Sequence, residues 1–213
     1  HSKTIDLFNI VRPDLVIHAA AESHVDNSIK NPSKFIKSNI NGTYNLLEAI
    51  RKNSLISKTL FFYISTDEVY GSLSQKGGQF YESNKFLPNS PYSASKSSSD
   101  LLVRAWNKTY GIKTLTSNCC NNYGPWQYHE KLIPLTIKRC LEKKPIPIYG
   151  NGKNIRDWIH VDDHSQIIIK LKKFGKYGEA YNIGSGYEIS NIKLVKTICL
   201  IFNKLTNNKY KYE

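Results

Sequence analysis

Two side chains that can exchange a proton with a hydroxyl group lie four residues apart, at Tyr92 and Lys96. At this spacing, both lie on one face of a helix. Because a nearby ammonium favours the phenolate, we expect Lys96 to lower the pKa of Tyr92 and the pair to act on a substrate hydroxyl. Such pairs also arise by chance on helix surfaces. Pro91 at the expected helix start and a buried strand upstream favour the functional interpretation.

Two adjacent carboxylates, Asp67 and Glu68, follow that buried strand directly after Ser65 and Thr66. In open α/β sheets, ligands bind at the carboxyl ends of the strands. Neighbouring carboxylates at that edge could act as acid and base on one substrate if their pKa values are held apart. A solvated turn, or an Asp that caps a short helix, is the alternative. The nearby Tyr-x-x-x-Lys pair favours function.

Alternating strands and helices would position these groups. Short apolar runs predict buried strands, and apolar residues at helical spacing predict crossover helices. This alternation is typical of an α/β fold with a largely parallel sheet. We expect strands over 15–17, 60–64, 112–117, 145–149 and 181–183, and helices over 33–53, 91–110, 161–174 and 191–203.

Composition narrows the class of protein. The chain has 213 residues, of which 40% are hydrophobic, which is enough for a sizeable core and excludes a disordered chain. No apolar stretch approaches the roughly 20 residues of a membrane span. The net charge of +13 comes from scattered lysines, which we interpret as compositional bias that also favours an anionic substrate. A basic nucleic-acid binder is kept as an alternative.

Cysteine and histidine residues do not predict a metal site. The four cysteines have no zinc-ligand spacing, so we interpret them as reduced thiols of a cytoplasmic protein. His18 and His160 lie in or beside apolar runs and are expected in the core. We expect Asp157 to lie in a turn, and Asp162 with Asp163 to cap the following helix.

Seven motifs then occur in a fixed order over nearly the whole chain. The set resembles the extended short-chain dehydrogenase/reductase family and, within it, the dTDP-glucose 4,6-dehydratases. Thr66-Asp67-Glu68 is the discriminating triplet, because epimerases and decarboxylases of this superfamily usually carry Ser or Thr there without the Asp-Glu pair. The motifs are AAAESHVD (19–26), STDEVYG (65–71), SPYSASK (90–96), NNYGP (121–125), EKLIP (130–134), RDWIHVDD (156–163) and YNIG (181–184).

The resemblance implies a Rossmann-like doubly wound parallel sheet, incomplete at the N-terminus, with a smaller substrate-binding part. It also implies an NAD-dependent lyase that converts dTDP-glucose to dTDP-4-keto-6-deoxyglucose. The sugar would be oxidised at C4, lose water across C5 and C6, and regain the hydride at C6. Tyr92 would remove the C4 hydroxyl proton, helped by Thr66 and Lys96. Glu68 would act as the base at C5, and Asp67 would protonate the departing C6 hydroxyl.

The resemblance also implies the binding residues. Arg156 would hold the pyrophosphate, because its guanidinium makes bidentate hydrogen bonds. The expected NAD-binding residues are Ala19, Ala20, Ala21, Ser23, Ser38, Tyr92, Lys96 and Asn122. The expected substrate-binding residues are Ser23, Thr66, Asn121, Glu130, Lys131, Leu132, Pro147, Ile148, Tyr149, Arg156 and Asn191.

The family pattern also bears on the organisation of the chain. The Gly-x-x-Gly-x-x-Gly turn with which the family opens does not precede Leu15, so we interpret the sequence as a fragment that alone binds NAD poorly. Residues 1–125 would be the remainder of the NAD-binding domain. Residues 126–213 would mostly bind the nucleotide sugar, with about 155–183 returning to the first domain. A homodimer through helices 33–53 and 91–110 is expected.

Three further interpretations remain open. The first is a UDP-glucose 4,6-dehydratase or another nucleotide-sugar epimerase or dehydratase. The second is a non-catalytic fragment that only binds nucleotide sugars; the intact Tyr92, Lys96, Thr66, Asp67 and Glu68 argue against long decay. The third is the nucleic-acid binder, whose affinity would fall steeply with salt.

Overall fold

The computed structural model describes residues 2–73, 78–148 and 150–206. The chain divides into two compact units. Unit 1 comprises His1–Cys119 and Gln166–Ile183, and unit 2 comprises Cys120–Ser165 and Gly184–Glu213. Each unit has its own sheet and its own apolar cluster, and we describe them separately.

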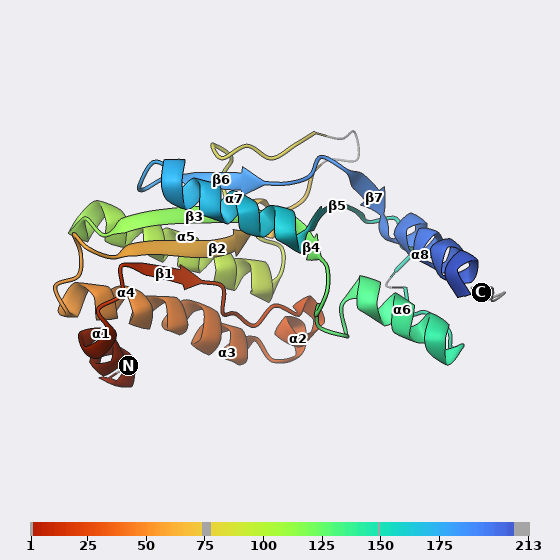
Figure 1. The fold of residues 1–213 in the computed structure, drawn as a ribbon, viewed down its shortest axis with the longest axis horizontal. Coiled ribbons are helices and arrows are strands. Elements are labelled where there is room, and N and C mark those ends of the chain that lie inside the picture. Colours follow the sequence, from red (N-terminus) through yellow and green to blue (C-terminus); the bar gives the residue numbers. More distant parts are fainter. Residues whose placement is uncertain (1, 74–77, 149, 207–213) are drawn as a thin grey trace. The chain divides into compact units, whose positions relative to one another are not determined.

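A four-stranded parallel sheet forms the centre of unit 1 (Figure 1). Its strands lie in the order β1 (Leu15–His18), β2 (Leu60–Thr66), β3 (Lys113–Cys119) and β6 (Ala180–Ile183). The predicted α/β class and these four strands are confirmed. Because every strand runs the same way, their carboxyl ends lie along one edge of the sheet.

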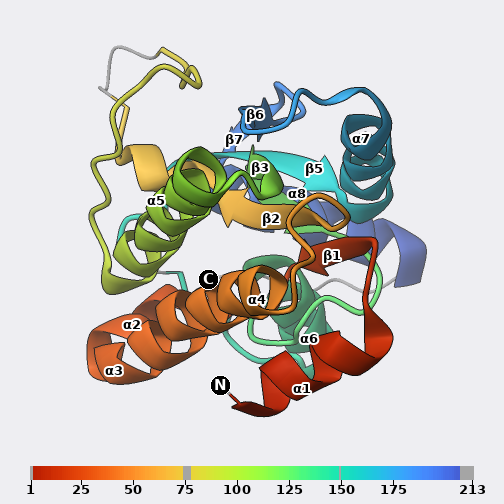
Figure 2. The same cartoon turned by 90° about the vertical axis from the view of Figure 1, so that its left-hand side faces the viewer.

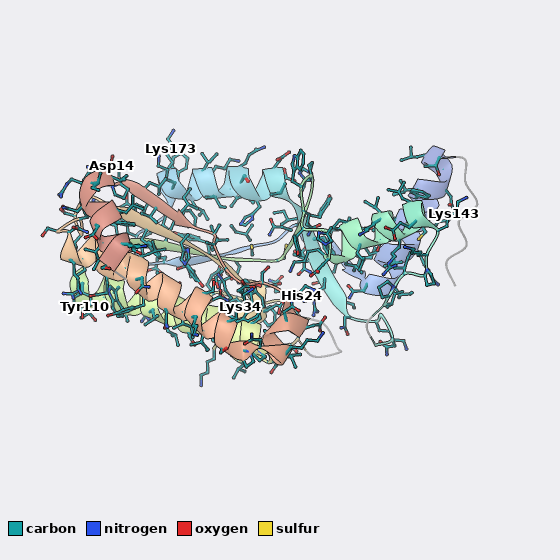
Figure 3. All side chains as sticks on the ribbon, turned by 90° about the horizontal axis from the view of Figure 1, so that it is seen from below. Asp14, His24, Lys34, Tyr110, Lys143 and Lys173 are labelled. Atoms are coloured by element: carbon teal, nitrogen blue, oxygen red, sulfur yellow. The ribbon has the colours of Figure 1, made fainter. Side chains whose placement is uncertain are left out.

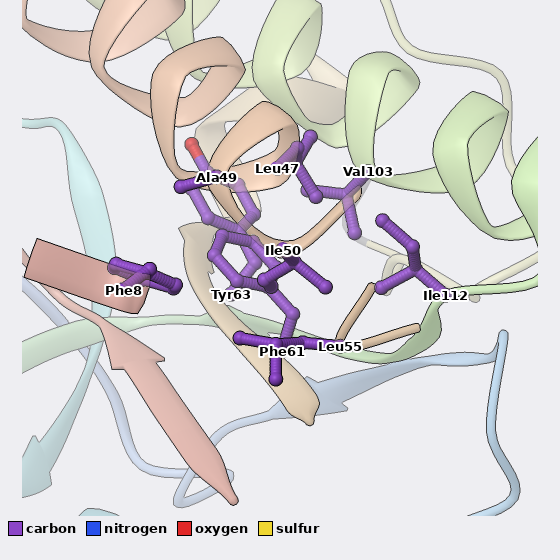
Figure 4. Close-up of a cluster of buried hydrophobic side chains, with 9 residues drawn as sticks. All are labelled: Phe8, Leu47, Ala49, Ile50, Leu55, Phe61, Tyr63, Val103 and Ile112. Carbon is purple, nitrogen blue, oxygen red and sulfur yellow. The ribbon is translucent and has the colours of Figure 1, made fainter. Parts of the chain in front are cut away.

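Alternate residues of β2 face opposite layers of helices, as the two-residue period of a strand requires. Phe61 and Tyr63 pack with α4 (Gly42–Lys52) and α5 (Pro91–Tyr110), in the cluster that Figure 4 shows. Leu60 and Phe62 pack with the part of α7 (Val161–Phe174) that belongs to unit 1. Figures 1 and 2 show α7 on one face of the sheet and α4 with α5 on the other.

The helix predicted over 33–53 forms as three consecutive segments. A short α3 (Pro32–Phe35) leads into a π-helical turn, η1 (Ile36–Asn41), and then into α4. Asn39 is buried inside η1 and hydrogen-bonds to the backbone of Glu22, so the helix widens where this polar side chain has to reach a neighbouring loop. The amino-terminal helix α1 (Ser2–Val11) packs on α4, while α2 (Val25–Lys30) precedes α3.

Local sequence signals fix both ends of α5. Ser90 accepts a hydrogen bond from the backbone N–H of Ser93, whose hydroxyl accepts one from the N–H of Ser90. This reciprocal pair is a capping box, and Pro91 fits the first helical position because its missing N–H needs no partner there. Gly111 ends the helix in the left-handed region at φ +75°, where a side chain would be strained.

Unit 2 contains a small mixed sheet and two packed helices. Strand β5 (Ile155–His160) pairs parallel with β4 (Asn121–Tyr123) and antiparallel with β7 (Glu188–Ser190). Helices α6 (Leu132–Glu142) and α8 (Asn191–Thr206) pack through Cys140 and Cys199, whose sulfur atoms lie 3.7 Å apart.

Two predictions fail in unit 2. The expected strand over 145–149 is absent from 145–148, where Pro145 and Pro147 remove backbone donors while Ile146 and Ile148 pack on the cluster of α6 and α8. Asp157 lies in β5 rather than in a turn. Its carboxylate accepts hydrogen bonds from the backbone N–H groups of Ser185 and Gly186, so it orders the loop before β7.

Charged side chains lie on the outside of each unit. Lys34 and Lys173 are exposed in unit 1 and Lys143 in unit 2, as Figure 3 shows. No helix in the described part of the chain is long and apolar enough to cross a membrane.

Candidate active site

The carboxyl end of β2 presents the Thr66-Asp67-Glu68 triplet. Thr66 is buried and caps the 3-10 helix η2 (Asp67–Tyr70), because its hydroxyl accepts a hydrogen bond of 3.3 Å from the N–H of Glu68. The same hydroxyl lies 3.3 Å from Oδ1 of Asp67. Thr66 is therefore the cap of the short helix. The two carboxylates lie in its first turn, partly exposed at the sheet edge.

Tyr92 lies in the first turn of α5, with its ring edge-on to Phe35. Burial raises the pKa of Tyr92 far above the ordinary value for tyrosine, and the nearby negative charge of Glu68 raises it further. A hydrogen bond with Thr66 opposes this change. The phenol is thus protonated in this geometry, and the four residues Thr66, Asp67, Glu68 and Tyr92 form one electrostatic group.

The prediction that Lys96 lowers the pKa of Tyr92 is wrong in this geometry. The ammonium of Lys96 donates a 2.6 Å hydrogen bond to the carbonyl of Ile64 and lies 4.2 Å from the centroid of the Tyr63 ring. It is therefore directed to the backbone and an aromatic face of β2. Burial lowers the pKa of Lys96 itself, while the negative charges of Asp100 and Cys119 oppose that shift.

The loop after β1 carries the expected cofactor residues Ala19, Ala20, Ala21 and Ser23. Ala19 and Ala20 are exposed, and all three alanines offer only methyl groups beyond the backbone. Asn39 fixes this loop: its Oδ1 accepts a 2.8 Å hydrogen bond from the N–H of Glu22, and its Nδ2 donates to the Ser95 hydroxyl at 2.8 Å. The loop is thereby tied to α5 between Tyr92 and Lys96. Ser38 precedes Asn39 in η1.

Asn39 is a residue of this region that the sequence interpretation missed. Its position gives a signal, because Phe35, Asn39, Thr43 and Leu47 share one helix face and all four are deeply buried. A polar side chain on a buried face needs a specific partner. Spacing alone could not reveal that the partners would be the loop before α2 and the hydroxyl of Ser95.

The remaining expected residues lie in unit 2. Asn122 of β4 lies 2.8 Å from Nδ1 of the buried His164 and donates to the carbonyl of Cys120. Arg156 is exposed on β5, Leu132 and Asn191 begin α6 and α8, and Ile148 packs on their apolar cluster. Asn121 is in β4, Glu130 and Lys131 precede α6, Pro147 is exposed, and Tyr149 lies outside the described residues.

The geometry of unit 1 defines a class of protein. A parallel sheet covered by helices on both faces carries a Tyr-x-x-x-Lys helix beside a Thr at the carboxyl end of a central strand. This combination is the short-chain dehydrogenase/reductase fold, a Rossmann-like arrangement whose strand ends form the binding edge.

Comparison with known proteins gives the family. The model of the family described as GDP-mannose 4,6 dehydratase matches residues 1–212, and the chain belongs to this family. It is 50% identical to the dTDP-glucose 4,6-dehydratase of Neisseria meningitidis and 48% identical to dTDP-glucose 4,6-dehydratase 1 of Escherichia coli. The matches cover 95% and 94% of this chain, which spans 59% and 60% of the two relatives.

A solved structure agrees with these relatives. The dTDP-glucose 4,6-dehydratase DesIV from Streptomyces venezuelae, solved with NAD bound, superposes with a TM-score of 0.88 at 40% identity. The match covers 98% of this chain and 62% of that protein. The chain therefore spans about three fifths of the length of the proteins it matches.

Proposed function

We propose that this protein is an NAD-dependent dTDP-glucose 4,6-dehydratase, which forms dTDP-4-keto-6-deoxyglucose. The observation that carries the proposal is the Thr66-Asp67-Glu68 triplet at the end of β2, in one electrostatic group with Tyr92. The names of the similar proteins support the substrate. The paired carboxylates support water elimination, because oxidation at C4 alone has no use for both.

The residues of unit 1 fit one side of a dinucleotide site. Ala19, Ala20 and Ala21 follow the carboxyl end of β1 with no bulky side chain, so a planar ligand can approach the backbone closely. Ser23 and Ser38 offer hydroxyls, and Asn39 holds the loop in place. When bound, NAD supplies the acceptor for the C4 hydride and the donor that returns it to C6.

Tyr92 and Thr66 act at the C4 hydroxyl in this proposal. Thr66 hydrogen-bonds the reacting oxygen, and the phenolate form of Tyr92 takes its proton as the C4–H bond breaks. The phenol holds its proton in this geometry, since its pKa is raised by burial and by Glu68. Lys96 lies one helical turn away from Tyr92. Its ammonium can favour the phenolate once its hydrogen bond to the carbonyl of Ile64 is broken.

Asp67 and Glu68 perform the elimination. The C4 ketone acidifies the proton on C5, which the carboxylate of Glu68 removes. The electron pair of that C–H bond forms the C5=C6 double bond as the C6 hydroxyl leaves, and Asp67 supplies the proton that turns it into water. Both carboxylates lie in one turn of η2, so they can reach adjacent carbons of one ring.

Residues of unit 2 are also proposed to bind the ligands, with Arg156 on the pyrophosphate and Asn122 near the nicotinamide. The full set is Asn121, Asn122, Glu130, Lys131, Leu132, Pro147, Ile148, Arg156 and Asn191. Tyr149 is proposed with the substrate residues from its sequence motif alone.

We further propose a cytoplasmic homodimer that pairs through α4 and α5. Tyr44 of α4 and Leu101 of α5 support that face, because 39% and 56% of their surfaces are exposed.

Substitution of Glu68 by Gln tests the proposed elimination. With NAD and dTDP-glucose in deuterated water, the unsubstituted protein should dehydrate the sugar and incorporate deuterium at C5. Glu68→Gln should lower both rates by about 10²- to 10⁴-fold, the usual contribution of a general base, while C4 oxidation continues. Mass spectrometry of the sugar and the absorbance of reduced NAD separate the two steps.

Glu179→Gln is the matched control, because Glu179 is an exposed carboxylate of unit 1 outside the site. It should leave both rates unchanged. Dehydration at the ordinary rate in Glu68→Gln would contradict the proposed role of Glu68. Running UDP-glucose beside dTDP-glucose measures the base preference, for which a larger kcat/KM with dTDP-glucose is expected.

A further inference from the structure

A buried acid, Asp100, lies one helical turn after Lys96 on α5 and has no role in the mechanism above. Only 5% of the surface of Asp100 and 4% of the surface of Lys96 are exposed. The carboxylate accepts a 2.6 Å hydrogen bond from the hydroxyl of Ser65. A carboxylate in such a place is costly unless neighbouring groups favour its charge, so its surroundings show what it does.

Lys96 and Asp100 hold two successive residues of β2. Lys96 donates to the carbonyl of Ile64 at 2.6 Å, and Asp100 accepts from the side chain of Ser65, also at 2.6 Å. The next residue along the chain is Thr66, which begins the Thr66-Asp67-Glu68 triplet. Two charged residues of α5 therefore fasten the strand immediately before the groups that are proposed to act on the sugar.

The two charges also support one another. Burial lowers the pKa of Lys96, and the negative charge of Asp100 acts against that loss. Burial raises the pKa of Asp100, whereas the Ser65 hydrogen bond and the positive charge of Lys96 act to lower it. Each side chain would be driven toward its neutral form in the absence of the other.

Titratable groups from the surrounding elements face this pair. They add negative charge or a neutral ring, and Lys96 is the cation of the set. They are Tyr63 of β2, Tyr70 of η2, Cys119 of β3 and His18 of β1. Asp100, the acidic residue of α5, is the charge that most strongly opposes the effect of burial on Lys96.

We propose that Asp100 is a positioning residue that keeps Lys96 charged and holds the end of β2 against α5. Asp100 acts on the reaction only through Lys96 and Ser65. This inference rests on the proposed function for what Lys96 does during turnover. The dependence of the Lys96 charge on Asp100 is a separate physical statement that can be measured without substrate.

The test is a pH titration of Lys96 in Asp100→Asn, a variant that keeps the size of the side chain and removes its charge. In protein labelled with ¹³C at lysine Cε, the Lys96 resonance is assigned from its absence in Lys96→Met. We expect its midpoint to lie at least about one pH unit lower in Asp100→Asn than in the unsubstituted chain, a tenfold change in the proton equilibrium. An unchanged midpoint in the folded variant overturns the proposal.

Two further variants separate a specific effect from a general one. Glu48→Gln removes another buried carboxylate of unit 1, one that binds Arg51 and Trp106, and should leave the Lys96 midpoint in place. Ser65→Ala removes the hydrogen bond that favours charged Asp100, so it should lower the midpoint by a smaller amount. If Asp100→Asn does not fold, as judged by circular dichroism, Ser65→Ala decides: no shift overturns the proposal.

Turnover then separates the two levels of inference. If the unsubstituted protein dehydrates dTDP-glucose, the alkaline limb of the kcat profile should move to lower pH in Asp100→Asn by the shift that the titration gives. A limb that stays in place overturns the role of Asp100 in the reaction. If the unsubstituted protein does not dehydrate the sugar, the proposed function fails, while the Lys96 titration still decides whether Asp100 controls its charge.

Discussion

The two halves of α5 pack against the same sheet with opposite chemistry. The first half buries Ser93, Ser95, Lys96, Ser99 and Asp100, whereas the second half buries Val103 in the apolar cluster of unit 1 (Figure 4). The sheet changes in the same direction: β2 begins with Leu60 and Phe61 and ends with Ser65 and Thr66. One helix and one strand therefore place a polar site and an apolar core side by side.

This contrast shows how the fold separates stability from chemistry. The apolar half gains free energy by removing carbon surface from water. The polar half has to recover the cost of desolvation through hydrogen bonds, and small hydroxyl side chains make this possible. Ser99, for instance, donates to the carbonyl of Asn39 in η1, so α5 lies close to its neighbour at the point where Lys96 and Asp100 are buried.

Substitution of Phe61 by Ala should have the largest effect on stability. Phe61 is fully buried among Leu47, Ile50 and Val103, so a cavity adds to the lost burial. We expect unfolding in urea to cost about 3–5 kcal/mol less free energy than in the unsubstituted chain.

Tyr92→Phe is the matched change at the polar end, since it removes only a hydroxyl whose charged form is disfavoured there. It should change the free energy of unfolding by less than about 1 kcal/mol, in the range of one ordinary hydrogen bond. A loss as large as that of Phe61→Ala would break the comparison between the two halves.

The pH dependence of stability that His18 causes is a test at the boundary between the polar and the apolar half. Its ring lies 5.9 Å from that of Phe61 and 5.5 Å from that of Tyr63, and its Nε2 lies 3.0 Å from the Thr43 hydroxyl. That hydroxyl donates to the carbonyl of Asn39, so it accepts from His18. Burial, followed by the charge of Lys96, lowers the pKa of His18 from 6.5 to about 4.

The sign of the pH effect follows from proton binding. Between about pH 6.5 and pH 4, the unfolded chain binds a proton that the folded chain excludes, so stability falls as the pH falls through this range. The contribution is fully present above pH 6.5 and amounts to on the order of 3 kcal/mol when it is lost. Urea unfolding at pH 7 and pH 4.5 measures it.

His18→Gln should reduce the fall in the free energy of unfolding between pH 7 and pH 4.5, which we call the acid slope, because the side chain no longer titrates. His129→Gln removes an exposed imidazole of unit 2 and is the control for loss of a histidine outside this cluster. An acid slope that survives in His18→Gln would show that another group of unit 1 is responsible, and His18 would then have to be a passive part of the core.

The comparison also explains what could be predicted from sequence. The apolar periodicity of 91–110 and the strand pattern around Phe62 depend on local spacing, and both elements form where they were expected. The predicted lowering of the Tyr92 pKa was wrong, because the prediction assumed that a charge four residues away must act on the phenol. The direction of the Lys96 side chain depends on the Ile64 carbonyl, a backbone group on another element.

Asn39 and Asp100 mark the same limit. Each is a polar residue on a face that helical spacing places inward, so a buried polar group could be anticipated. The partners, Ser95 and the loop at Glu22 for Asn39 and Ser65 for Asp100, come from segments 17 to 56 residues away. Only the three-dimensional arrangement brings them together.

The smallest predicted effect lies at the start of the polar half. Ser90→Ala removes the hydroxyl that accepts from the N–H of Ser93, leaving an amide of the first turn without its cap. We expect a loss of about 1 kcal/mol in the free energy of unfolding, measured in urea.

Ser98→Ala makes the same chemical change inside α5, where the Ser98 hydroxyl donates to the Ala94 carbonyl, which also belongs to the helix. It should be neutral or slightly stabilising, since alanine favours a helix interior more than serine does. Equal losses in the two variants would mean that the capping box contributes no more than any hydroxyl of the helix. The polar half would then be held in place chiefly by its buried contacts with β2 and η1, and its first turn, which carries Tyr92, would depend on Ser65, Asp100 and Asn39 rather than on its own cap.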